Sequence, residues 1–181
     1  MKKKPSPKRT RARRPARLPR RTAKPDQARQ EKFNISSILV PIDFSLHSKN
    51  ALKYAVPLAE KFRASLHLVY VVEPTIYPAD LGFGQVVLPG VEEELREKGG
   101  EELQSLMVKE IGGRVKSSCS VRTGNPHQEI LREAEELGVA LIVVATHGHS
   151  GVEHMLFGST ADRIVRNAKC PVLTVRPEVP K

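Results

Sequence analysis

The chain has 181 residues, with 30 Lys and Arg against 20 Asp and Glu, and a formal net charge of +10. This length fits one domain plus an appendage. The longest purely apolar run has seven residues, 139–145, whereas a membrane span needs about 20. The composition therefore argues against an integral membrane protein. The two cysteines, Cys119 and Cys170, are too few for a disulfide framework, and we expect a cytoplasmic setting.

The positive charge is concentrated at the N-terminus. Residues 1–32 carry 14 Lys and Arg against two acidic residues, whereas residues 33–181 carry 16 basic and 18 acidic residues. Five prolines and few apolar side chains accompany the N-terminal charge, so this segment buries too little surface to offset the entropy of ordering. The sequence predicts a disordered basic tail over residues 1–35, a globular domain over 36–177 and a short C-terminal tail over 178–181.

Three functional interpretations of the basic tail are a secretory signal, a transit peptide and a polyanion-binding arm. The tail lacks the apolar segment of a secretory signal, and its prolines argue against the amphipathic helix of a transit peptide. A polyanion-binding arm for nucleic acid or a ribosome would contact backbone phosphates without reading sequence, because no aromatic residue is interleaved with the charge. A solvated tail without a partner is the alternative. The candidate phosphate contacts are Lys8, Arg9, Arg11, Arg13, Arg14, Arg17, Arg20 and Arg21.

From residue 36 onward, strand patterns alternate with helix patterns. Continuous apolar runs predict buried strands, with the run 139–145 as the central one, and the alternation over 115–121 predicts a strand near a sheet edge. Asn125 and Gln128 predict a capping box at one helix start. The predicted elements in chain order are strand 38–42, a helix from the Asp43–Ser45 cap to residue 62, strand 65–72, an irregular flap over 73–89, helix 91–111, strand 115–121, helix 126–137, strand 139–145, helix 159–167 and strand 171–175.

Five strands alternating with four helices predict an α/β fold, a doubly wound parallel sheet with helices on both faces. In such folds ligands lie beyond the carboxyl ends of the strands, where the strand order reverses. Beyond the strand that ends at Ala145, Gly148 permits a close backbone approach. Gly158 and Ser159 place amides and a hydroxyl at a helix N-terminus, which suits an anion. The spacing predicts a phosphate cradle, although ordinary turn and cap chemistry would explain it equally well.

Several motifs in order along the chain resemble the universal stress protein family. They are Ile38-Leu39-Val40-Pro41-Ile42-Asp43-Phe44-Ser45, then Gly124-Asn125-Pro126, then Ala145-Thr146-His147-Gly148 with nine residues before Gly158-Ser159, and finally Cys170-Pro171-Val172-Leu173-Thr174-Val175. The resemblance covers residues 36–177. It implies strand order 3-2-1-4-5 and a homodimer paired through the last strand. In the nucleotide-binding branch it also implies a site for ATP or AMP, which Mg²⁺ can accompany.

Carried over to this sequence, the resemblance assigns the parts of that site. Asp43 would meet the ribose or the adenine edge, and Val71 would pack on the adenine. The family pattern has glycine where this chain has Ala145, whose methyl group could crowd the ligand. The predicted nucleotide-binding residues are Pro41, Ile42, Asp43, Val71, Val144, Ala145, His147, Gly148, Gly158, Ser159 and Thr160.

No catalytic or metal-ligating residue is assigned. His147, His149 and His154 do not have the spacing of HExxH, and no GxxxxGK[ST] motif is present. Ser159 lacks the GxSxG elbow of a nucleophile. The resemblance to the universal stress protein family implies a dimeric stress-response module that binds nucleotide. The alternatives are a nucleic-acid- or ribosome-associated factor that acts through its tail and, more weakly, a slow ATPase.

Overall fold

The structure is a computed structural model that describes residues 34–74, 90–147 and 158–176. Every described element belongs to the unit Phe33–Lys181. Three predicted features lie outside the described residues: the candidate phosphate contacts of the basic tail, most of the flap predicted over 73–89, and the site residue Gly148.

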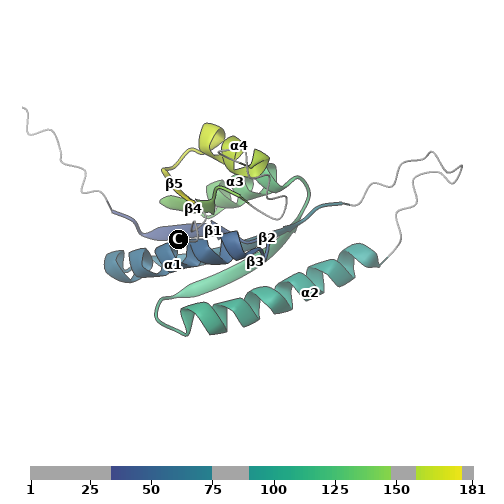
Figure 1. Ribbon diagram of the computed structural model, residues 1–181, viewed down its shortest axis with the longest axis horizontal. Coiled ribbons are helices and arrows are strands. Elements are labelled where there is room, and N and C mark those ends of the chain that lie inside the picture. Colours follow the sequence, from purple (N-terminus) through teal and green to yellow (C-terminus); the bar gives the residue numbers. More distant parts are fainter. Residues whose placement is uncertain (1–33, 75–89, 148–157, 177–181) are drawn as a thin grey trace, which may run out of the picture. The chain divides into compact units, whose positions relative to one another are not determined.

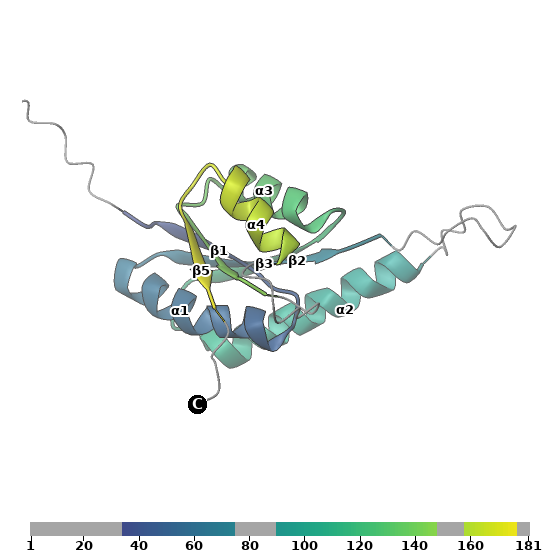
Figure 2. The ribbon, with the colours of Figure 1, turned by 45° about the horizontal axis from the view of Figure 1, so that its top comes forward.

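The described residues form a five-stranded, all-parallel sheet in the order β3-β2-β1-β4-β5, which confirms the expected topology. Figure 1 and Figure 2 show α1 and α2 on one face of this sheet and α3 and α4 on the other. A π-helical turn continues α2. The bounds are β1 Ser37–Pro41, α1 Leu46–Phe62, β2 Ser65–Val72, α2 Val91–Leu106, η2 Met107–Ile111, β3 Ser117–Thr123, α3 Pro126–Glu136, β4 Leu141–Ala145, α4 Ser159–Asn167 and β5 Val172–Val175.

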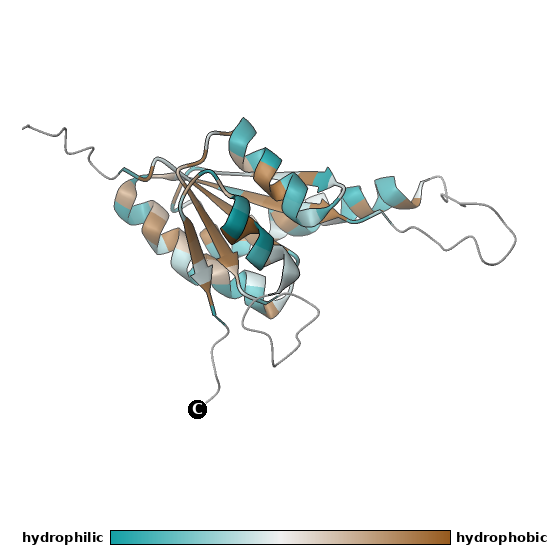
Figure 3. Cartoon of the chain, turned by 90° about the horizontal axis from the view of Figure 1, so that it is seen from above, coloured by the Kyte–Doolittle hydropathy of each residue, from teal (hydrophilic) through white to brown (hydrophobic). Residues whose placement is uncertain are grey.

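Each face of the sheet carries its own apolar core. Because side chains alternate along a strand, Leu66 and Leu68 of β2 join the core under α1 and α2. Val69, the residue after Leu68, joins the core under α3 and α4, together with Leu39 and Ile130. Figure 3 shows this arrangement as apolar strands covered by helices with hydrophilic outer faces. In a parallel sheet covered by helices on both faces, ligands bind beyond the carboxyl ends of the strands.

Some sequence predictions need correction. The strand that ends at Ala145 is fully buried, but β1 occupies the centre of the sheet and β4 lies beside it. The predicted capping box is absent, because no side chain among the described residues caps α3 at Asn125. None of the helices within the described ranges is both long and apolar enough to span a membrane.

Gly99 shows why a glycine lies in the middle of α2. A Cβ at this position would lie 2.5 Å from Cδ1 of Tyr70. The Tyr70 ring also packs against the ring of Phe44, with centroids 4.8 Å apart. The absence of a side chain at Gly99 therefore allows α2 to pack closely against β2. Tyr70 is held between α2 and the turn that follows β1.

Candidate functional site

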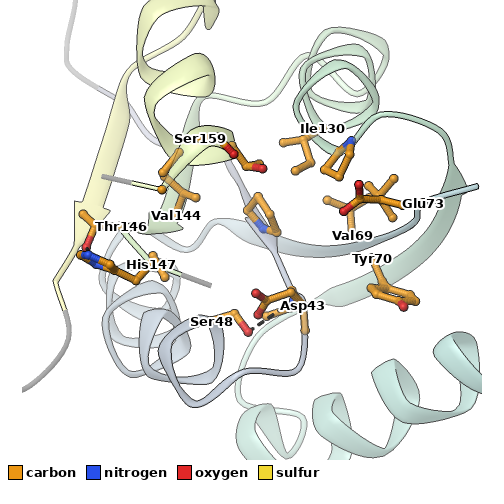
Figure 4. A pocket seen from close by; sticks show the side chains of 18 residues that line it. Asp43, Ser48, Val69, Tyr70, Glu73, Ile130, Val144, Thr146, His147 and Ser159 are labelled. Atoms are coloured by element: carbon orange, nitrogen blue, oxygen red, sulfur yellow. Dashed lines mark hydrogen bonds between the residues drawn. The ribbon is translucent and has the colours of Figure 1, made fainter. Parts of the chain in front are cut away.

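A pocket of about 320 Å³ lies where β1, β2 and β4 end. The strand order reverses between β1 and β4, which is the position expected for a ligand in an open α/β sheet. Its volume is at the lower end of the range for small-molecule sites. Figure 4 shows its side chains converging from the sheet, α1, α3 and α4. The lining residues are Pro41, Ile42, Asp43, Ser48, Val69, Tyr70, Val71, Glu73, Pro126, Ile130, Val144, Ala145, Thr146, His147, Gly158, Ser159, Thr160 and Ala161.

The turn between β1 and α1 holds Asp43 at the edge of the pocket. Asp43 Oδ1 accepts hydrogen bonds from the amide of Ser45 at 3.0 Å and from its hydroxyl at 2.5 Å. The amide of Asp43 donates to Ser48 Oγ at 3.3 Å. Phe44 between them has φ 62°, in the left-handed region that an aromatic residue rarely adopts. These bonds fix the direction of the carboxylate and stabilise the unusual backbone.

Ser45, rather than Asp43, caps α1. Its hydroxyl oxygen accepts a hydrogen bond from the amide of Ser48 at 3.1 Å. Asp43 supports this cap, because its Oδ1 accepts a hydrogen bond from the hydroxyl of Ser45. The sequence motif over 43–45 thus supplies both a helix cap and an oriented carboxylate.

The N-terminus of α4 forms the opposite wall of the pocket. The amide of Gly158 donates to the carbonyl of Thr146 at 2.7 Å, and a Cβ on Gly158 would lie 3.3 Å from that oxygen. No side chain among the described residues caps this helix. Ser159 and Thr160 line the pocket, and the first amides of a helix have no acceptor within it. This wall therefore presents N–H donors, hydroxyl groups and the positive end of a helix dipole to an anion.

Between these two walls the pocket is apolar. Val69, Val144 and Ile130 belong to the core under α3 and α4 and also line the pocket. Val71, two residues beyond Val69 on the same face of β2, packs partly buried against that core. An apolar slot beside an anion-binding helix end suits a flat ring that carries an anionic group.

Glu73 and Tyr70 add a polar edge to the pocket that sequence reasoning missed. Both line the pocket. Burial raises the pKa of the Tyr70 phenol, and the negative charges of Glu102, Asp43 and Glu73 raise it further. The phenol is therefore neutral at physiological pH and can donate a hydrogen bond.

The structure brings together ten of the eleven residues predicted for the site, and Gly148 lies outside the described residues. Ala145 lies in the pocket lining, but alternation along β4 places its methyl group on the face of Leu141 and Val143, toward α1. His147 also lines the pocket, and the centroid of its ring lies 6.2 Å from that of His47. No group of three metal-ligating side chains comes together within the described part of the chain.

Eight lining residues were not predicted for the site. They are Pro126 and Ile130 of α3, Val69, Tyr70 and Glu73 at the end of β2, and Ser48, Thr146 and Ala161. Pro126 belongs to the Gly124-Asn125-Pro126 motif, so the sequence did contain a pattern that could have assigned the start of α3 to the site. Gly124 has φ 145°, and a Cβ there would lie 3.0 Å from Cγ of Glu129. That motif therefore sets the start of α3 against the pocket.

Comparison with known proteins identifies the family. Residues 34–176 match the model of the universal stress protein family. The chain is 37% identical over 141 residues to the universal stress protein MJ0531 of Methanocaldococcus jannaschii, a match that covers 77% of this chain and 81% of that protein. It is 33% identical over 146 residues to YxiE of Bacillus subtilis, covering 78% and 99% of the two chains.

Solved structures agree with this similarity. The fold matches UspA from Lactobacillus plantarum with a TM-score of 0.68 at 24% identity, covering 79% of this chain and 99% of that one. The family match spans all five strands and the pocket between them. The chain belongs to the universal stress protein family.

Proposed function

We propose that the pocket binds an adenine nucleotide, ATP or AMP, and that the protein is a regulatory module of the stress response. The observation that carries this proposal is the N-terminus of α4, which no described side chain caps and which faces an apolar slot inside one pocket. The phosphates would lie against Gly158, Ser159 and Thr160, with Gly148 and His147 nearby. Mg²⁺ would accompany the phosphates of ATP.

The other end of the pocket suits adenosine. Asp43 would accept hydrogen bonds from the ribose hydroxyls or from the adenine edge, because its carboxylate is oriented by Ser45. Pro41, Ile42 and Val71 would contact the base. Ala145 is compatible with this arrangement, since its methyl group points to the α1 face and leaves the slot formed by Val144 unchanged.

Known structures of this fold support the ligand class. A universal stress protein was solved in complex with cAMP, and an Arabidopsis thaliana family member was solved with AMP bound. Each is 19% identical to this chain, with a TM-score of 0.55. That likeness extends to the fold, so the proposal for this chain rests on the pocket itself.

We also propose that the module acts as a cytoplasmic homodimer paired through β5. This strand ends the sheet, and Leu173 on it is 37% exposed. Sheet edges offer unpaired backbone groups to a second copy. Sedimentation of wild type and Leu173→Lys tests this, since a charge at the paired edge would give monomers. A wild type that sediments as a monomer would contradict it.

Calorimetric titration with AMP and ATP tests nucleotide binding. Wild type should bind, and Gly158→Val should bind roughly tenfold or more weakly, because its side chain pushes α4 away from Thr146. Val165→Ala, on the exposed face of α4, is the matched control and should bind as wild type does. Absence of heat with either nucleotide, at concentrations that saturate ordinary sites, would reject the proposal.

A second candidate function rests on the charge of residues 1–32, a net of +12 in the sequence. We propose that this tail binds the phosphate backbone of nucleic acid, free or in a ribosome. Binding of RNA should then weaken steeply with salt, and deletion of residues 1–32 should abolish it. Affinity that survives the deletion, or that ignores salt, would reject this candidate without affecting the nucleotide site.

A further inference from the structure

A second cluster of polar side chains lies outside the pocket, where β2 and β3 face α3. The ring of His67 on β2 contacts three side chains. Its Nδ1 lies 2.8 Å from Oγ of Ser118 on β3, and its Nε2 lies 2.9 Å from Oε1 of Glu133 on α3 and 3.0 Å from Oγ of Ser120 on β3. A serine, a histidine and a carboxylate are therefore joined in series.

The partners of the ring decide which nitrogen carries the proton. The ionised carboxylate of Glu133 only accepts hydrogen bonds, so the proton lies on Nε2 of His67. Nδ1 then presents a lone pair, and the hydroxyl of Ser118 donates to it. This is the arrangement of a nucleophile, a general base and a group that orients the base.

The carboxylate that orients His67 is unusually well fixed. Glu133 is 3% exposed, yet it accepts hydrogen bonds from Ser120 at 2.7 Å and from Arg122. Burial opposes its ionisation, but these bonds and the charge of Arg122 outweigh that effect and lower its pKa. Arg122 is shared with Glu136 one turn further along α3. Glu133 therefore stays charged and holds the ring in one orientation.

We propose that Ser118 is a nucleophile activated by His67 and that it accepts the acyl group of a small activated ester. Nothing in the nucleotide pocket is needed for this reaction. Ser118 and His67 are the catalytic residues, since they touch the reacting atoms, and Glu133 is a positioning residue.

The acyl transfer is balanced within this group. Oγ of Ser118 attacks the ester carbonyl, and its proton moves to Nδ1 of His67. The carbon–oxygen bond to the alcohol breaks, and the departing alkoxide takes the proton from Nδ1. An acyl-serine and a neutral alcohol result, and water releases the acyl group by the reverse sequence of proton transfers.

Ser118 is accessible to such a reagent. Its side chain is exposed on β3, which is an edge strand of the sheet. His67 is 14% exposed beneath it, so the base is shielded while the nucleophile faces solvent. Lys116, which is exposed and directly precedes β3, would bring a positive charge close to the oxyanion that forms. An open strand edge suits a small ester better than a bulky one.

Acetylation of the intact protein by p-nitrophenyl acetate tests the proposal. Peptide mapping should find the acetyl group on Ser118, and its formation should be roughly 100-fold faster than on other serines. Ser118→Ala should lose this adduct. Ser117→Ala, which changes the opposite face of β3, is the matched control and should react as wild type does. Acetylation of Ser118 no faster than that of other serines would overturn the proposal.

The role of His67 has its own readouts. His67→Gln keeps a polar side chain and should reduce the acetylation of Ser118 to the rate of an ordinary serine; thermal unfolding checks that this variant is folded. In wild type, the rate should fall on acidification as His67 becomes protonated under the influence of Glu133 on α3 and Arg122 on β3. Glu133→Gln should shift this pH profile. A pH-independent wild-type rate would overturn the assignment whether or not the variants fold.

Discussion

Substitution of the two adjacent glycines of α2 tests the packing beside the pocket. At Gly99 a new Cβ would lie 2.5 and 2.6 Å from two carbons of the Tyr70 ring, about 1 Å closer than a favourable carbon–carbon contact. The ring has little room to retreat, because Phe44 packs on it. At Gly100 the new Cβ would lie 3.9 Å from Cγ2 of Val121, an ordinary contact.

The two alanine variants should therefore change stability in opposite directions. Replacing a helical glycine by alanine stabilises by about 1 kcal/mol through propensity, and Gly100→Ala should show most of this gain. Gly99→Ala adds an overpacking cost of about 1–3 kcal/mol, so its net effect should be a loss of up to about 2 kcal/mol. Urea unfolding of both variants beside wild type measures the difference.

The result that would refute this reasoning is equal stability of the two variants. It would mean that Tyr70 moves away without cost and that α2 is not held against β2 through Gly99. A second readout follows from the position of Tyr70 in the pocket lining. Gly99→Ala should also weaken nucleotide binding, whereas Gly100→Ala should leave it unchanged.

Three further predictions follow from the structure. Glu133→Ala should lower the free energy of unfolding by about 3 kcal/mol, because it leaves Arg122 and His67 without their buried partner. Glu94→Ala, which removes one member of an exposed ion pair, should have no measurable effect. An equal loss of stability in the two variants would contradict this account. Ala145→Gly should lose about 1 kcal/mol of stability while calorimetric affinity for AMP stays unchanged, and tighter binding would show that the methyl group crowds the ligand. The pKa of His67 is lowered in the folded protein, chiefly by burial. On acidification the unfolded state therefore binds a proton first, and the free energy of unfolding should fall as pH drops through about 6.5. His67→Gln should flatten this decline in urea unfolding, and an unchanged slope would contradict the prediction.

Local signals in the sequence predicted most of the fold. The bounds of α4 agree with the prediction at both ends, because Gly158 before it and the apolar periodicity within it are both local. The edge position of β3 followed from its alternating pattern. The centre of the sheet was misassigned, because β1 and β4 are both inner strands with two neighbours, and burial alone does not say which of them lies in the middle.

The candidate site was predictable only where it follows a motif. Asp43 and Gly158 adjoin recognisable turns, and the structure places both in the pocket lining. Glu73 and Ile130 reach the same pocket from elements whose contacts depend on how β2 and α3 pack. The series of Ser118, His67 and Glu133 was missed for the same reason, since its members come from three elements and its two contacts join residues 51 and 66 positions apart.

A crystal structure of the protein grown with AMP would test the central claim most directly. The account predicts the phosphate within hydrogen-bond distance of the amides of Ser159 and Thr160, and the adenosine between Asp43 and Val71. An empty pocket under saturating AMP, or a nucleotide whose phosphate points away from α4, would contradict it.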